Sequence, residues 1–236
     1  YEFQRKQGNL IGKKSFRIFL MLNGFLAPLL IGTAVGTFFT GSEFIVNKAA
    51  VGDIASPVIS QWTNNLHGLE AVGNSFNLLF GLMVMFISLI LGALYMINNI
   101  GSEKLCKSLL RCLASCFGCF LVIFLYVVFE LFLMDGYAVN QDGSVYMESG
   151  KYLNNFLEMP VVLALFLIGA LLFVAGVAFT LKNLTFKRGI WLAGPGIVMA
   201  VMALFMVAGY NDTAYYPSYV DLQSSLTISN SCSSEF

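Results

Sequence analysis

The chain alternates between long apolar stretches and shorter polar segments. Each of the five apolar stretches holds about the 20 residues that a helix, rising about 1.5 Å per residue, needs to cross roughly 30 Å of hydrocarbon. A helix is expected because lipid offers no water to backbone groups, and because the stretches are longer than the about 9–11 residues of a barrel strand. The stretches are residues 16–39, 76–97, 112–134, 160–181 and 191–210.

This pattern predicts an all-α fold, a polytopic transmembrane helical bundle with five spans that forms one membrane domain over residues 1–236. Two of the connecting segments are long, residues 40–75 and 135–159. In the second, the tripeptide Gln-Asp-Gly at 141–143 is a turn signal between short pieces of β-forming residues. A small hairpin is therefore predicted in that loop.

Composition and charge refine this picture. Hydrophobic residues make up 58% of the chain and charged residues 11%, against about 45–50% and about 25% in soluble domains. Lysines and arginines alternate between two sides in step with the stretches, and cytoplasmic segments retain positive charge. The start of the chain is therefore predicted to be cytoplasmic and its end extracytoplasmic. The inner group is Arg5, Lys6, Lys13, Lys14, Arg17, Lys104, Lys107, Arg111, Lys182, Lys187 and Arg188, and the outer group is Lys48 and Lys151.

Small residues recur every four positions in the first stretch, at Gly24, Pro28, Gly32 and Gly36. This spacing lets the backbones of two membrane helices approach closely, which is how helices associate in lipid. We interpret these four residues as helix-packing residues, since the spacing indicates no chemistry.

Three polar residues are candidates for a functional role. Glu130 is the only acidic residue within a stretch, and an ionisable residue in a membrane is by default a functional candidate. Its place near the outer end favours shallow pairing or hydration over a proton relay. His67, the only histidine, lies in an outer loop close to Glu70. It is either a packed loop residue or a ligand, and ligation of haem or a metal requires further ligands.

Cys112, Cys116 and Cys119 share one helical face. We interpret them as small packing residues that face a neighbouring helix, rather than as a metal or redox site, because no histidine accompanies them. No metal-ligand spacing, P-loop, dinucleotide fingerprint or basic and aromatic nucleic-acid pattern occurs in the sequence. The residues alone leave open a transporter, a channel piece and a non-catalytic subunit of a larger complex.

Three segments resemble subunit II of the cytochrome bd quinol oxidases. One is YEFQRK with NGFLAPLLIGTAVGTFFTGSEF, in which Gly32, Ala34 and Gly36 match the family's G-x-A-x-G spacing and Pro28 and Gly41 match its flanking residues. Another is MDGYAVNQDGSVYM with KYLNNFLEMPVVL, and the third is the final GYNDTAYYPSYVDLQSSLTISNSCSSEF. The resemblance runs in order over the whole chain. It implies a fragment that lacks the family's N-terminal helices and its last helix.

The resemblance implies a respiratory quinol oxidase of the bacterial inner membrane that reduces dioxygen to water and contributes to the proton motive force. It implies a heterodimer in which subunit I carries haem b, haem d and the catalytic centres. This chain would have no catalytic residue, ligate no cofactor or metal, and support assembly of its partner. Some members hold a structural quinone in subunit II, and the resemblance leaves open whether this chain does. Membrane lipid and, for the complex, quinol are the other expected partners, while nucleic acid is not expected.

A multi-span transporter subunit without redox chemistry is the alternative. Transporter folds carry midplane helix breaks or charged residues in corresponding halves, and here the stretches hold only the shallow Glu130. A haem absorption spectrum of the purified full-length protein distinguishes the two hypotheses.

Overall fold

Five long helices dominate the computed structural model, which describes residues 12–47, 60–183 and 186–228. Each is long and apolar enough to cross a membrane, so the predicted fold class is confirmed. The segment YEFQRK lies outside the described residues, as does Lys48. The helices are α2 (Gly12–Thr40), α3 (Ser75–Asn99), α4 (Glu103–Leu133), α6 (Pro160–Lys182) and α7 (Gly189–Gly209).

The helix ends depart most from the predicted range in α4. This helix begins at Glu103 rather than at residue 112 and has 31 residues, which corresponds to a length of about 46 Å. Its first turns carry Lys104, Lys107 and Arg111. These turns are helical, but they were not predicted because they are not apolar. The apolar pattern marks the part that suits hydrocarbon, whereas backbone hydrogen bonding continues beyond it.

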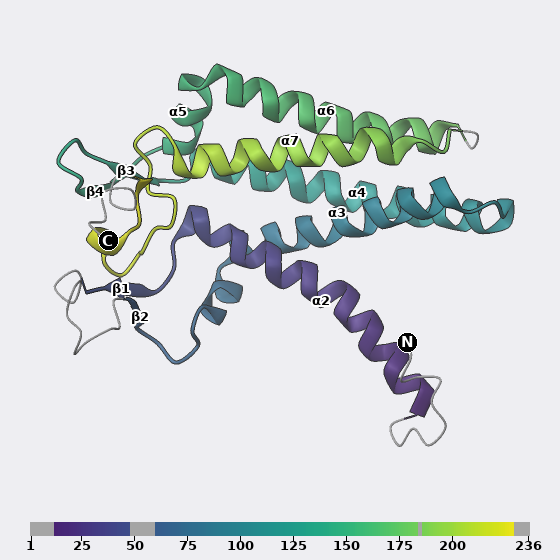
Figure 1. Ribbon diagram of the computed structural model, residues 1–236, viewed down its shortest axis with the longest axis horizontal. Helices are drawn as coiled ribbons and strands as arrows, with labels where there is room; N and C mark the ends of the chain where they lie inside the picture. The colour runs from purple at the N-terminus through teal and green to yellow at the C-terminus, as the bar shows by residue number, and fades with distance from the viewer. Residues whose placement is uncertain (1–11, 48–59, 184–185, 229–236) are drawn as a thin grey trace.

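The helices associate mainly as two pairs, α6 with α7 and α2 with α3, and the N-terminal half of α2 diverges from the bundle (Figure 1). Glycines allow α6 and α7 to approach closely. A Cβ atom added at Gly169 would lie 2.6 Å from the Gly196 carbonyl oxygen, and one added at Gly176 would lie 2.7 Å from the Gly189 carbonyl oxygen. Such contact between backbones supplies the packing that holds membrane helices together.

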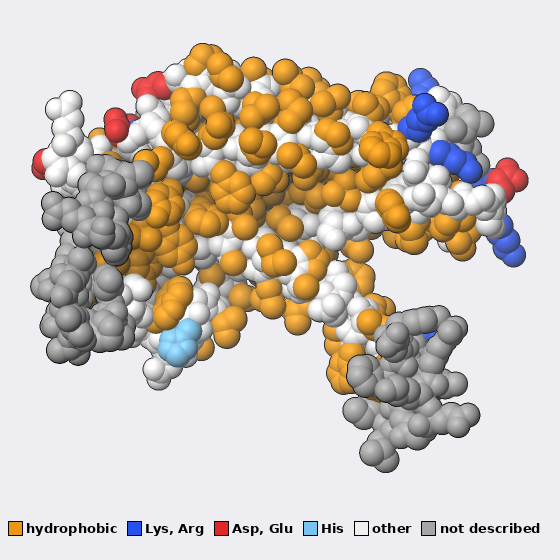
Figure 2. Space-filling view, in the orientation of Figure 1, with side chains coloured by type: hydrophobic (Ala, Val, Ile, Leu, Met, Phe, Trp, Pro, Cys, Tyr) orange, Lys and Arg blue, Asp and Glu red, His pale blue; other side chains and the backbone are white. Residues whose placement is uncertain are grey.

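Charged side chains gather at the two ends of the bundle and leave an apolar belt between them (Figure 2). We call one of these the basic end; the α3–α4 and α6–α7 turns form it. The Lys187 ammonium group donates a hydrogen bond to the Ile100 carbonyl oxygen at 3.3 Å, which joins these two turns. The described cations of the two turns and the adjoining helix ends are Lys104, Lys107, Arg111, Lys182, Lys187 and Arg188.

The opposite end, which we call the cap, is built from two small sheets and short helices. The predicted hairpin is confirmed: β3 (Gly136–Val139) pairs antiparallel with β4 (Val145–Glu148), and Gly143 adopts a φ of 83° in the turn. The other elements are β1 (Phe44–Val46), β2 (Ser60–Trp62), η2 (Leu69–Gly73), α5 (Lys151–Glu158) and η3 (Leu222–Ser224).

The last part of the described chain, residues 210–228, passes across the cap and joins its parts. Ser218 bridges Ser42, and its hydroxyl donates a hydrogen bond to the Phe44 carbonyl oxygen at 2.6 Å. The ring of Tyr216 stacks on that of Phe44, with a centroid distance of 5.2 Å. The segment therefore pairs with the loop that follows α2, far away in the sequence.

Two buried tyrosines donate hydrogen bonds to carbonyl groups at the end of α2. The hydroxyl of Tyr152 donates to the Phe39 carbonyl oxygen and that of Tyr137 donates to the Thr40 carbonyl oxygen, both at 2.9 Å. The last carbonyl groups of a helix have no partner within the helix, so these bonds cap it. Burial raises the pKa of the Tyr137 hydroxyl to about 12 and also raises the pKa of Tyr152.

We expect Tyr137 to make the protein sensitive to alkali. Its pKa in the folded chain is raised from the ordinary 10.0, so its contribution to stability is complete below about pH 10 and is lost as the pH rises through about 12. Thermal unfolding measured between these pH values should show a weaker pH dependence for Tyr137→Phe than for the wild type. Tyr146→Phe, on the exposed side of the same hairpin, is the control. The same dependence of the unfolding temperature on pH in all three proteins would contradict the prediction.

Candidate functional site: an apolar cavity between the helices

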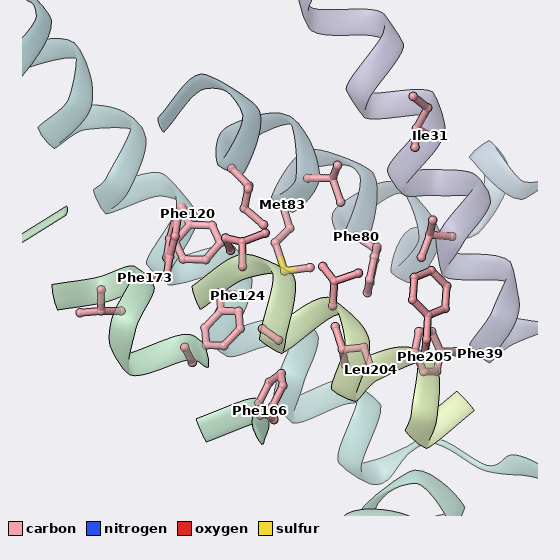
Figure 3. Close-up of a pocket in the computed structure, with 18 residues that line it drawn as sticks. Ile31, Phe39, Phe80, Met83, Phe120, Phe124, Phe166, Phe173, Leu204 and Phe205 are labelled. Carbon is pink, nitrogen blue, oxygen red and sulfur yellow. The ribbon is translucent and has the colours of Figure 1, made fainter. Parts of the chain in front are cut away.

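A cavity of about 300 Å³ lies where all five long helices meet (Figure 3). Aromatic side chains form much of its wall. They come from α2, α3, α4, α6 and α7, and are Phe39, Phe80, Phe120, Phe124, Phe166, Phe173 and Phe205.

The aromatic wall is tightly packed. Phe120 meets Phe173 edge to face at 5.1 Å and stacks on Phe124 at 5.4 Å between ring centroids. Phe39 packs against Phe80 at 6.0 Å. Such ring pairs contribute about 0.5–1.5 kcal/mol each to stability beyond the burial of apolar surface. These contacts therefore fix the positions of the side chains that line the cavity.

The chemistry of the cavity follows from its lining. All its lining residues are apolar, including Met83, Ala170 and Leu204. An apolar cavity stays dry and takes apolar guests, and these side chains offer no group for proton transfer. The cavity therefore suits an alkyl or isoprenoid chain.

A groove of about 540 Å³ adjoins the cavity, and Ile31 and Val35 of α2 line both. Unlike the cavity, the groove carries polar side chains at the cap, among them His67, Thr37 and Ser42. An amphiphile could therefore place a polar head in the groove beside the cavity.

The small-residue stripe of α2 divides into two parts. A Cβ atom added at Gly32 would lie 2.7 Å from Val84 Cβ, and one added at Gly36 would lie 2.6 Å from the Asn77 side chain, so both glycines face α3. Pro28 lies within α2, half-buried. Gly24 is exposed and has no atom within 4 Å of an added Cβ, so it does not share this contact.

The structure places His67 and Glu70 in a tight turn before α3. His67 is exposed with a φ of 48°, and its backbone N–H donates to Asn64 Oδ1 at 3.2 Å. Glu70 Oε2 accepts a hydrogen bond from the Gly68 N–H at 2.8 Å. The Glu70 carboxylate thus stabilises the turn that carries His67.

Glu130 lies in the last turn of α4. Its Oε2 atom is buried and has no hydrogen-bond partner within the described part of the chain. A buried carboxyl oxygen without a donor is costly, so a hydrogen-bond donor such as a water molecule is expected at this position. Glu130 does not line the cavity.

Two of the three cysteines predicted to pack differ from the expectation. Cys112 and Cys119 are exposed, whereas Cys116 is half-buried and packs against the hydrophobic core. The reason is that Leu113 and Phe120 occupy the buried face of α4. Across the described ranges, no group of three or more His, Cys, Asp or Glu residues could hold a metal ion.

The sequence did not single out several residues that shape this region. Gly81 of α3 faces Thr33 and the backbone of Leu29, and so completes the contact made by Gly32. The sequence signal that could have identified Gly81 is the presence of a glycine within an apolar stretch. The aromatic lining of the cavity had no signal of its own, because phenylalanines occur in every stretch.

The fold, the apolar belt and the cavity define a polytopic helical membrane protein. The sequence profile of one family, described as cytochrome bd terminal oxidase subunit II, matches residues 1–236. The chain belongs to that family, and the recognised resemblance is confirmed. The family is part of a haem-containing oxidase complex, which implies a subunit I partner and oxidoreductase activity of the complex. A search of curated proteins found no match.

Proposed function

We propose that this chain supports the assembly and stability of a haem-bearing subunit I, and that the complex oxidises membrane quinol and reduces dioxygen to water. The match of the family profile over residues 1–236 is the observation that carries the proposal. Haem b and haem d would belong to the partner. This assignment is supported by the single histidine of this chain, His67, which is exposed in a turn, because several haems would need several such ligands.

The distribution of charge supports a defined orientation in the bacterial inner membrane. We propose that the basic end faces the cytoplasm and that the cap faces the opposite side, because cytoplasmic segments retain lysine and arginine. Quinol oxidation by the complex would then contribute to the proton motive force.

Gentle purification of the full-length protein tests this proposal. We expect a haem-bearing chain to co-purify, with a haem absorption spectrum and quinol-dependent oxygen uptake. A colourless protein that purifies alone would overturn the proposal and favour a transporter or a structural membrane protein.

We infer further that the apolar cavity holds the isoprenoid tail of a structural quinone. Its wholly apolar lining and its volume of about 300 Å³ support a hydrocarbon guest, and the adjoining groove supplies polar groups for a head. The role would be structural, since the lining offers no group that could transfer a proton.

Filling the cavity should displace that tail. Ala170 lines the cavity, whereas Ala164 is exposed on the same helix. We expect solvent extraction and chromatography to recover less quinone per haem from Ala170→Phe than from the wild type, while Ala164→Phe retains the wild-type amount. Equal quinone content in all three complexes would contradict this assignment.

A further inference from the structure

Two thiols lie side by side on α4. Cys112 and Cys116 are one helical turn apart, and their Sγ atoms are separated by 4.0 Å. Residues at this spacing are neighbours on one helix face. Cys112 is exposed and Cys116 is half-buried, so both sulfurs are presented together at the surface of the helix.

The pair lies at the boundary between hydrocarbon and water. α4 is about 46 Å long, from its 31 residues, whereas the hydrocarbon layer is roughly 30 Å thick. The excess belongs to the basic end, because charged side chains such as Lys104, Lys107 and Arg111 are costly in hydrocarbon. Cys112 follows Arg111 directly, so an ion from the aqueous phase can reach it.

The helix geometry disfavours a disulfide between these thiols. Cβ atoms four residues apart on a helix are about 5–6 Å from each other, whereas a disulfide requires about 3.5–4.5 Å. The two sulfurs can therefore share a ligand more readily than they can bond to each other.

We propose that Cys112 and Cys116 form a two-thiolate site for a soft monovalent metal ion of the Cu(I) class. Thiolates select such ions. The two Sγ atoms are 4.0 Å apart. A metal ion with metal–sulfur bonds of about 2.3 Å would therefore join them with a sulfur–metal–sulfur angle of about 120°, and a small side-chain rotation would widen this angle. Zinc in a structural site takes four ligands, and the described residues offer no group of three or more.

Metal binding at this site involves no change of oxidation state. Each thiol loses its proton to water, two metal–sulfur bonds form, and no electron is transferred. The resulting site carries one net negative charge. Arg111, directly before Cys112 in α4, supplies positive charge near it, whereas Lys107 is paired with Glu103 at 3.7 Å.

A competition experiment on the reduced full-length protein in its complex tests the site. Under anaerobic conditions, Cu(I) is supplied as its coloured bicinchoninate complex. We expect the wild type to withdraw about one more Cu(I) ion per chain than Cys112→Ser or Cys116→Ser does. Cys119→Ser removes the third thiol of the same helical face, and it should behave as the wild type does, because the close sulfur contact is between Cys112 and Cys116. Equal uptake by all four proteins, or an equal loss in Cys119→Ser, would overturn the proposal.

A second measurement uses the unaltered protein and so does not depend on the folding of variants. Maleimide labelling, located by mass spectrometry, should be suppressed by Cu(I) at Cys112 and Cys116 and unchanged at Cys119. If Cu(I) did not reduce the labelling of Cys112 and Cys116, this result would also overturn the proposal. Because the haem spectrum reports the complex separately, failure of this site and failure of the proposed function give different results.

Discussion

Gly32→Leu should reduce the yield of the assembled complex about tenfold or more, corresponding to at least about 1.4 kcal/mol. A Cβ atom at this position would lie 2.8 Å from Gly81 Cα, which is backbone and cannot rotate away. Overpacking typically costs about 1–3 kcal/mol, and a leucine adds further atoms beyond Cβ. The haem absorbance of the purified complex, relative to total protein expressed, measures the effect.

Gly24→Leu is the matched control for this substitution. It introduces the same side chain two turns earlier on α2, where nothing lies within 4 Å of the added Cβ. We therefore expect a yield much closer to that of the wild type. If Gly32→Leu assembled as well as the wild type, close packing of α2 on α3 would not be required.

Asn155→Leu should lower the thermal unfolding temperature of the protein by several degrees. Asn155 is fully buried, and its amide donates to the Val207 carbonyl oxygen and to Thr213 Oγ1, each at 2.8 Å. Leucine is similar in size but cannot donate, so the Val207 carbonyl at the end of α7 loses a partner. An unpaired buried group costs about 1–3 kcal/mol, and each kcal/mol shifts Tm by about 2–4 °C in a chain of this size.

The neighbouring asparagine provides the control for Asn155→Leu. Asn154 is exposed, and its amide donates to Glu148 Oε1 at 3.3 Å. Asn154→Leu should therefore change Tm little, because water can replace this bond. Similar Tm values for the two variants would show that burial of Asn155 does not matter.

The helices were predictable because hydrocarbon imposes a length and an apolar composition on each of them. Their ends were less so, as α4 shows: its first turns are charged, yet they continue the same hydrogen-bonded helix. The β3–β4 hairpin was predictable from its local turn signal. The short helix α5 was not, because its polar sequence depends on burial of Tyr152 and Asn155 against distant segments.

The candidate site was predictable only in part. The spacing of Gly32 and Gly36 indicated a close helix contact, but it could not identify α3 as the neighbour or separate Gly24 from the others. The cavity depends on residues from Ile31 to Phe205, brought together by the packing of five helices. Periodicity indicates which face of a helix is buried, but not where opposing side chains fail to fill the space between helices.

The bonds between the cap and the final segment also impose an order on biosynthesis. The hydrogen bond from Ser218 to Phe44 joins residues 174 positions apart. At about 5–20 residues per second, the ribosome supplies the second partner about 9–35 s after the first. During that interval β1 lacks this hydrogen-bond partner, and water hydrates the Phe44 carbonyl group. The contact of α2 with α3 can form much earlier, so the contact at Gly32 and Gly36 can hold α2 in place until residues 210–228 have been synthesised.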